Sequence, residues 1–326
     1  MGVREYSGMT VKRSHALRLL GAAAAAPAVA GFPAVVRSQS LTTVRVGTIP
    51  IDVAANVYYA QDLGLFAKAG LDVQIQPLGS GPALAQAVAG SAIDFGISNV
   101  ATIALAKLRG LPFRFVAPSA VVLPGKKPTD VIMVAPDSTI TPGPSVNGKI
   151  IAINGLRDLQ ELEARGWVDK VGGDNTTIKF IEVPFPSMGG ALQQGRADII
   201  FPTEPFSTAN ASVGKVIANA FDGVGPRFML LGWFSSDTYL AANHDTAAKF
   251  VSALRQASEY ANAHQAETAQ MLANHTKVTI DVAQKMVRAT YGTALDPSLL
   301  TPVLNLGLKY GLLSQPVAAA DLIWKP

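Results

Sequence analysis

Short apolar runs alternate with longer stretches of helical spacing in the first part of the chain. Period-two alternation or continuous burial predicts strands, whereas apolar positions three and four apart predict helices. The predicted strands are residues 43–50, 71–78, 92–99 and 112–121, and the predicted helices are residues 57–70, 82–90 and 100–110. This order is typical of a mostly parallel sheet covered by helices.

A turn-rich break, GKKPTD, occupies residues 125–130, and a second α/β run follows it. Its predicted strands are residues 131–138, 149–154, 178–185, 197–204 and 216–221, with helices at 158–166 and 188–195. Residues 228–243 cross back, and helices are predicted at 245–275, 279–291 and 303–313. We therefore expect an export signal with a short tail over residues 1–40, a first lobe from 41–130 and 235–326, and a second lobe from 131–234.

Two segments repeat the same order of features. AVAGSAIDFGISN ends a helix at Gly90 and begins a strand at Asp94, and ALQQGRADIIFPTE does the same with Gly195 and Asp198. Polar residues follow both strands. The repeat predicts two similar units, although a helix, a glycine turn and a strand occur in many α/β folds.

Composition narrows the possible chemistry. Hydrophobic residues make up 49% of the 326 and charged residues 15%, which is typical of a folded chain rather than a disordered one. Cysteine is absent, so a disulfide, a thiolate metal site and a thiol nucleophile are excluded. The net charge of +4 belongs to residues 1–40; the rest carries 22 basic and 22 acidic residues. Hence no nucleic-acid surface is expected.

The first residues have the three parts of an export signal. A basic stretch containing Lys12 and Arg13 precedes an apolar run at 19–26, and small residues stand at Ala28 and Ala30. The order predicts cleavage near Ala30 and a periplasmic protein. Twin-arginine and general secretion both remain open, as does an uncleaved membrane anchor.

Four segments resemble the substrate-binding proteins of ABC importers, in particular the sulfonate, nitrate, taurine and thiamine-pyrimidine binders. They are residues 46–99, 147–155, 183–206 and 231–243, in the same order as in that family. The resemblance implies an α/β, two-lobed, type II periplasmic-binding-protein-like fold, with two mostly parallel sheets flanked by helices and two crossovers. It also implies a small polar or anionic ligand in the cleft, a permease and an ATPase as partners, a monomer, and no catalytic residue, cofactor or metal.

Ligand contacts are expected just after the strands, because the cleft of an open parallel sheet lies at the carboxyl ends of its strands. Helices that begin there direct N–H groups toward a ligand, which suits an anion or an oxygen-rich group. The candidate residues are Pro50, Ile51, Asp52, Ser80, Gly81, Ser98, Asn99, Asn154, Gly155, Leu156, Arg157, Thr203, Glu204, Phe206 and Trp233.

Several candidates have a plainer structural alternative. Gly81 could let a ligand approach the backbone, in which case its replacement should leave the ligand-free protein folded, or it could belong to an ordinary capped turn. Arg157 could clamp an acidic group or lie in solvent. Glu204 could accept hydrogen bonds from an amine, an amide or a ring N–H, or form an ion pair between the lobes. Trp233 could form an apolar wall or belong to the core.

Two other classes of function remain open. Some relatives with this fold are enzymes of cofactor biosynthesis, and a ligand-sensing module is a third possibility. His244, His264 and His275 are spaced like helix surface residues rather than like a metal site or a catalytic triad. The export signal favours transport.

Overall fold

The computed structural model describes residues 40–325, so the predicted export signal and its cleavage site lie outside the described residues. One set of strands comes from two separate parts of this range, residues 42–118 and 232–236. They are β1 (Thr42–Thr48), β2 (Leu71–Pro77), β3 (Gly96–Ser98), β4 (Phe113–Pro118) and β12 (Gly232–Ser236). β1 runs parallel to β2, and β12 lies antiparallel between β3 and β4. A parallel bridge from Val46 to Phe95 joins β1 to β3.

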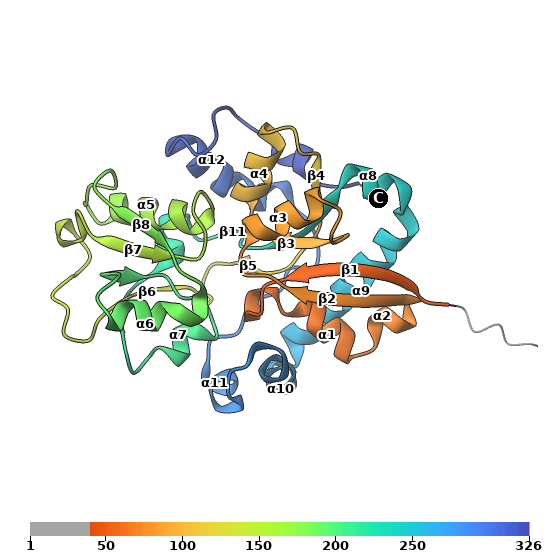
Figure 1. Ribbon diagram of the computed structural model, residues 1–326, viewed down its shortest axis with the longest axis horizontal. Helices are drawn as coiled ribbons and strands as arrows, with labels where there is room; N and C mark the ends of the chain where they lie inside the picture. The colour runs from red at the N-terminus through yellow and green to blue at the C-terminus, as the bar shows by residue number, and fades with distance from the viewer. Residues whose placement is uncertain (1–39, 326) are drawn as a thin grey trace, which may run out of the picture. The chain divides into compact units, whose positions relative to one another are not determined.

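Helices pack against these strands or against one another around them (Figure 1). They are α1 (Asn56–Asp62), α2 (Leu65–Lys68), α3 (Gly81–Ala89), α4 (Val100–Leu108), α8 (Asp237–Ala242), α9 (His244–Ala263), α10 (Gln265–Thr276), α11 (Ile280–Lys285) and α12 (Thr301–Lys309). The helix expected over 57–70 is interrupted at Gly64, whose φ of +66° is left-handed. The helix expected over 279–291 ends at Lys285, and Met286 is extended.

The second sheet has five strands from the middle of the chain. They are β6 (Val131–Val134), β7 (Ile150–Ile153), β8 (Lys179–Glu182), β9 (Ile199–Ile200) and β10 (Lys215–Asn219), in the order β10-β6-β9-β7-β8. Figure 1 shows α5 (Leu159–Lys170) on one face, and α6 (Met188–Gln193) and α7 (Phe206–Ala209) on the other. Short 3-10 turns occur at Asp52–Ala54, Pro144–Val146, Phe185–Ser187, Ala220–Gly223, Pro297–Leu299 and Ala319–Leu322.

The two sets of strands follow the same plan, as the sequence repeat predicted. The spatial order is β2-β1-β3-β12-β4 in the first set and β8-β7-β9-β6-β10 in the second. In each set the first three strands run parallel, the next strand is antiparallel to them, and the last strand is antiparallel to that one. The repeated aspartates have the same role: Asp94 accepts a hydrogen bond from Arg45 N at 2.8 Å, and Asp198 accepts one from Ile150 N at 2.8 Å. The left-handed residue is Gly195 in one copy and Ser91, rather than Gly90, in the other.

Two crossings connect the sheets. β5 (Val121–Val122) leaves the first set of strands and pairs antiparallel with β11 (Phe228–Met229), which returns to it. Apolar side chains from α5 and the faces of the second sheet form their own cluster around Trp167 and Phe201, both almost fully buried. None of the helices within residues 40–325 is long and apolar enough to cross a membrane.

Candidate functional site

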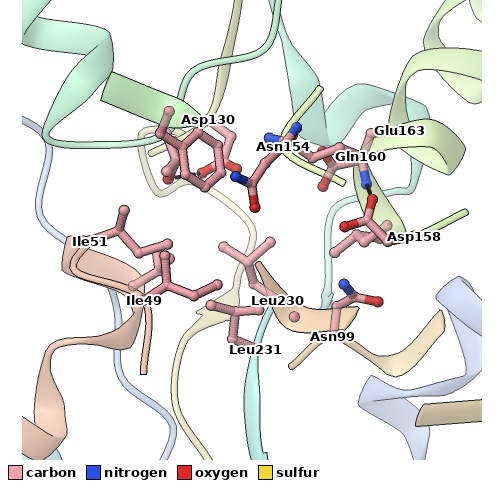
Figure 2. A pocket seen from close by; sticks show the side chains of 15 residues that line it. Ile49, Ile51, Asn99, Asp130, Asn154, Asp158, Gln160, Glu163, Leu230 and Leu231 are labelled. Atoms are coloured by element: carbon pink, nitrogen blue, oxygen red, sulfur yellow. Dashed lines mark hydrogen bonds between the residues drawn. The ribbon is translucent and has the colours of Figure 1, made fainter. Parts of the chain in front are cut away.

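A cavity lies where loops from both sheets meet. Figure 2 shows Asp130, Asn154, Asp158, Gln160 and Glu163 on one side of it, and Ile49, Ile51, Leu230, Leu231 and Asn99 on the other. Val53, Gly81, Leu159, Phe185 and Thr203 complete its wall. Among these wall residues there is no Lys, Arg or His. The cavity therefore has an apolar half and a polar half, here called the acidic half, in which three carboxyls lie among neutral polar groups without a basic side chain.

The apolar half comes from the end of β1 and from the returning crossing. Ile49 and Ile51 follow the buried strand β1, and Leu230 and Leu231 lie between β11 and β12. All four are at most 8% exposed. Their branched side chains exclude water from this side, which strengthens electrostatic interactions on the other.

The acidic half is built around the start of α5. Asp158 is the N-cap of this helix and accepts a hydrogen bond from Gln160 N at 3.0 Å. Gln160 Oε1 accepts from Asn154 N at 2.6 Å, and Gln160 Nε2 donates to Phe201 O at 2.9 Å. These bonds fix the β7–α5 loop to β9. Burial raises the pKa of Asp158 to about 7, and the nearby Glu161 and Glu182 add to the rise.

Glu163 lies one turn further along α5. It is 0% exposed, and neither carboxylate oxygen has a hydrogen-bond partner in the part of the chain that the structure describes. Burial raises its pKa well above the ordinary value, and the charges of Asp130 and Asp158 raise it further. A buried carboxyl without partners destabilises a fold, so its presence on a cavity wall points to a role outside folding.

Asp130 completes the acidic side from the other crossing. Its Oδ1 accepts from Thr203 Oγ1 at 2.7 Å and from Thr129 Oγ1 at 2.8 Å. Burial raises its pKa to about 6, against the lowering effect of these two bonds. Asp130 and Thr203 also form an isolated antiparallel bridge. The cavity thus collects carboxyls from two separate segments.

A larger, mostly apolar pocket adjoins this cavity and shares Ile49, Ile51 and Phe185 with it. Its other residues are Pro50, Pro77, Leu78, Gly79, Pro184, Pro186 and Phe206. The rings of Phe185 and Phe206 lie nearly parallel, 8° apart in plane with centroids 6.5 Å apart. Both sheets contribute to this outer pocket as well.

The sequence matches a known protein family over most of the segments that form this site. A family model described as NMT1/THI5 like matches residues 52–268, more than half of the chain. The chain belongs to this NMT1/THI5-like family. A search of curated proteins gave no match.

Solved structures show the same fold. The ligand-binding component of an ABC-type import system from Staphylococcus aureus is 18% identical with a TM-score of 0.77, over 87% of this chain and 96% of that one. The alkanesulfonate-binding protein SsuA from Xanthomonas axonopodis pv. citri is 19% identical with a TM-score of 0.73, over 87% of this chain and 98% of that one. The periplasmic nitrate-binding protein NrtA from Synechocystis PCC 6803 is 16% identical with a TM-score of 0.72, over 86% of this chain and 85% of that one. These likenesses confirm the two-lobed, periplasmic-binding-protein-like fold.

Seven of the fifteen residues expected to contact ligand line one of the two spaces in this NMT1/THI5-like chain. Ile51, Gly81, Asn99, Asn154 and Thr203 line the inner cavity, and Pro50, Ile51 and Phe206 line the outer pocket. Asn154 Nδ2 also donates to Gly79 O at 3.1 Å, which joins the two sides. Asn99 caps α4 by accepting from Thr102 N at 2.9 Å.

Gly81 has a structural reason that the sequence did not reveal. A Cβ at this position would lie 2.5 Å from Ser98 Oγ. Ser98 is fully buried and lines neither space. A larger residue at Gly81 would therefore meet Ser98 in the ligand-free protein, which argues against the expectation that its replacement leaves that protein unaffected. Ser80 is partly exposed, makes no capping bond and lines neither space.

Five other candidates lie away from both spaces. Leu156 and Arg157 are exposed, and Arg157 N donates to Glu161 Oε2 at 2.9 Å. Gly155 is buried beside Asp158. Trp233 is 0% exposed and donates from Nε1 to Asn56 Oδ1 at 3.0 Å, so it belongs to the core. Asp52 is also fully buried, in an ion pair with Arg288.

Glu204 joins segments rather than facing the cavity. Its carboxylate accepts from Thr208 N at 3.1 Å, Thr208 Oγ1 at 2.9 Å and Val287 N at 3.2 Å, while its carbonyl accepts from Asp52 N at 3.2 Å. Burial raises its pKa in spite of these bonds. The ion pair considered as its alternative role does not form within residues 40–325; hydrogen bonds connect Glu204 to residues 52, 208 and 287 instead.

Sequence reasoning missed Asp130, Asp158, Gln160 and Glu163. One signal for Glu163 was available: it stands four residues after Leu159 and four before Trp167, both buried on α5, so a charge interrupts an apolar helix face. No group of three or more His, Asp or Glu within residues 40–325 is placed to hold a metal ion. His244 and His275 instead lie beside Asp245 and Asp62.

Proposed function

We propose that this chain is a solute-binding protein that works outside the cytoplasmic membrane and delivers a small organic ligand to the permease and ATPase of an ABC importer. The observation that carries the proposal is the cavity itself, whose walls come from both sheets at the ends of their strands. The Staphylococcus aureus protein with this fold is a ligand-binding component of an ABC-type import system. The export signal expected from the sequence supports the same setting.

The wall chemistry favours binding over catalysis. Its polar members are carboxyls, amides and a single hydroxyl, that of Thr203, which is held in its bond to Asp130, and they include no histidine, lysine or cysteine. This supports a protein that holds a ligand and releases it unchanged. The carboxyls argue against the anionic ligands that the sequence analysis allowed, because the inner wall has no basic side chain to oppose them.

We further propose that the chain is a monomer whose two lobes, residues 41–130 with 235–326 and residues 131–234, close on the ligand. The hinge lies in the two crossings near residues 125–134 and 230–237. Two hydrogen bonds, Asn154 Nδ2 to Gly79 O and Asp52 N to Glu204 O, connect loops of the two proposed lobes and support a closed arrangement.

Two measurements test this function. Protein purified from the periplasm without denaturation should release a small molecule on unfolding, identifiable by mass spectrometry. A strain that lacks the chain should lose uptake of that compound and regain it with the intact gene. Unchanged uptake, or protein retained in the cytoplasm with Met1 intact, would contradict the proposal.

A further inference from the structure

We propose that the two spaces together select an amphipathic cation: a protonated amine or amidinium head bound by Asp130, Asp158 and Glu163, with an apolar body in the outer pocket. This assignment rests on the proposed function, since it takes the cavity to be the site of the transported solute. It is argued from charge, hydrogen bonding and size.

The charges that face the inner cavity have one sign. Asp130 reaches it from the crossing before β6, and Asp158 and Glu163 reach it from α5. The further charged groups that act on these three are Glu161, Glu182 and Glu204, which are also carboxyls. Arg288 is occupied by Asp52 and lines a different pocket, with Lys126 and Lys127. A cation is attracted by every ionised carboxyl on this wall, and an anion is repelled by each of them.

Glu163 supplies a second, independent observation. Buried polar groups in folded proteins almost always have a hydrogen-bond partner, and a buried charge without one is strongly unfavourable. Glu163 is fully buried on the cavity wall with both oxygens unpaired in the described part of the chain. An ammonium or amidinium N–H group would provide the missing donor. A sulfonate or carboxylate oxygen could accept a bond only from a protonated Glu163 and would leave its other oxygen unpaired.

Two of the helix starts beside the inner cavity are capped by side chains, whereas α3, whose first residue Gly81 lines the cavity, has no capping bond from Ser80. Asn99 caps α4 through the bond from Thr102 N, and Asp158 caps α5 through the bond from Gln160 N. One N–H group at each of these two helix starts therefore bonds to a side chain of the protein. At α5 the capping group is itself a carboxyl, which disfavours a ligand anion beside it.

The sizes of the two spaces indicate the shape of the ligand. The inner cavity has a free volume of about 40 Å³, room for roughly three waters and hence for a compact head group. The outer pocket has about 370 Å³ and is lined mainly by proline, leucine, isoleucine and phenylalanine. The near-parallel rings of Phe185 and Phe206 suit a flat or chain-like apolar body. A head in one space and a body in the other uses both.

Three probes of one shape test the charge: benzylamine, benzyl alcohol and phenylmethanesulfonate, titrated calorimetrically into the mature protein at pH 8, after unfolding and refolding to remove retained ligand. Benzylammonium should bind at least about tenfold more tightly than the alcohol, and the sulfonate should bind more weakly than the alcohol. Sulfonate binding equal to or tighter than amine binding would overturn the proposal.

Substitutions locate the effect. Glu163→Gln and Asp158→Asn should each weaken benzylammonium binding at least about tenfold while leaving the alcohol nearly unchanged. Glu161→Gln is the matched control on the same helix, because Glu161 bonds to Arg165 and to Arg157 N and lines neither space. Amine affinity unchanged in both cavity variants would overturn the assignment, and Asp158→Asn keeps the test valid if Glu163→Gln does not fold.

Different results would overturn the cation assignment and the proposed transport function. A strain whose uptake depends on the chain, together with a protein that prefers the sulfonate or binds none of the three probes, overturns the cation assignment alone. A protein that binds none of the probes and supports no uptake overturns the proposed function as well.

Discussion

Two groups of buried carboxyls in this molecule have opposite surroundings. Asp52 and Glu163 are both 0% exposed. Asp52 Oδ1 pairs with Arg288 Nη2 at 3.1 Å and accepts from Tyr59 OH at 3.2 Å, and its Oδ2 accepts from Ala289 N at 2.6 Å. Tyr291 OH donates to the Asp52 carbonyl as well. Glu163 has no such partner within the described residues.

The difference separates a structural carboxyl from a binding one. Asp52 connects the loop after β1 to residues 288–291, so its charge is compensated by the fold itself. Glu163 lines a cavity, and the fold provides no partner within the described residues for its ionised form. Burial alone therefore does not identify a ligand site; burial without partners on a cavity wall does.

The largest effect should come from breaking the compensated pair. Arg288→Ala leaves Asp52 buried without its counter-charge, and we expect a loss of about 3–5 kcal/mol in the free energy of unfolding. Urea denaturation measures it. Arg255→Ala is the control, because Arg255 is about half exposed and pairs with Glu259 at 3.5 Å; it should change stability by less than about 0.5 kcal/mol. Similar losses in both variants would remove the distinction drawn for Asp52.

A second test asks whether every unpartnered polar group marks a ligand. Ser98 Oγ also lacks a partner in the described chain, yet it packs against Gly81 and not against the cavity. Gly81→Val should destabilise the ligand-free protein by about 1–3 kcal/mol through this contact. Adding Ser98→Gly should recover part of the loss in thermal unfolding. A wild-type melting temperature for Gly81→Val alone would show that the turn yields freely, as the sequence interpretation expected.

The pH dependence of stability tests the buried carboxyls of the cavity, Asp158 and Asp130. The pKa of Asp158 rises to about 7 on folding, and that of Asp130 to about 6. Between these values and about pH 4, the folded protein therefore holds protons that the unfolded chain releases. The contribution of these two groups to the free energy of unfolding is full below about pH 4 and is lost as pH rises toward 7. Asp158→Asn keeps an N-cap residue but removes its titration.

The free energy of unfolding of ligand-free wild type should consequently fall relative to that of Asp158→Asn as pH rises from 4.5 to 8. Urea denaturation at several pH values gives both curves. Parallel curves would mean that Asp158 titrates alike in the folded and unfolded states. Asp198→Asn is not a suitable control, because Asp198 accepts the bond from Ile150 N that fixes the repeated turn.

The smallest effect is expected at Arg157. The side chain is exposed, and its φ is +57°, a region in which glycine is less strained. Arg157→Ala should change both stability and probe binding by less than about 0.5 kcal/mol, and Arg157→Gly should be neutral or slightly stabilising. Calorimetry and thermal unfolding check both. A large loss of binding would restore Arg157 as a ligand clamp.

The sequence carried the plan of the fold because strand and helix periodicities are local, and the repeat of Asp94 and Asp198 marked equivalent turns. It also indicated the loops after β1, β3, β7 and β9 as the place of the cavity. It did not identify Glu163 or Asp130, since whether a carboxyl is paired depends on segments far away in the chain. Asp52 shows this most clearly: its partner Arg288 is 236 residues distant.

We expect the carboxyls of the inner cavity, above all the unpartnered Glu163, to bind the positively charged end of a solute. A crystal structure with benzylamine tests it most directly. The account predicts the amine nitrogen about 2.7–3.2 Å from a carboxyl oxygen of Glu163, Asp158 or Asp130, with the ring against Phe185 and Phe206. An amine bound elsewhere, or phenylmethanesulfonate with its sulfonate in the inner cavity, would contradict it.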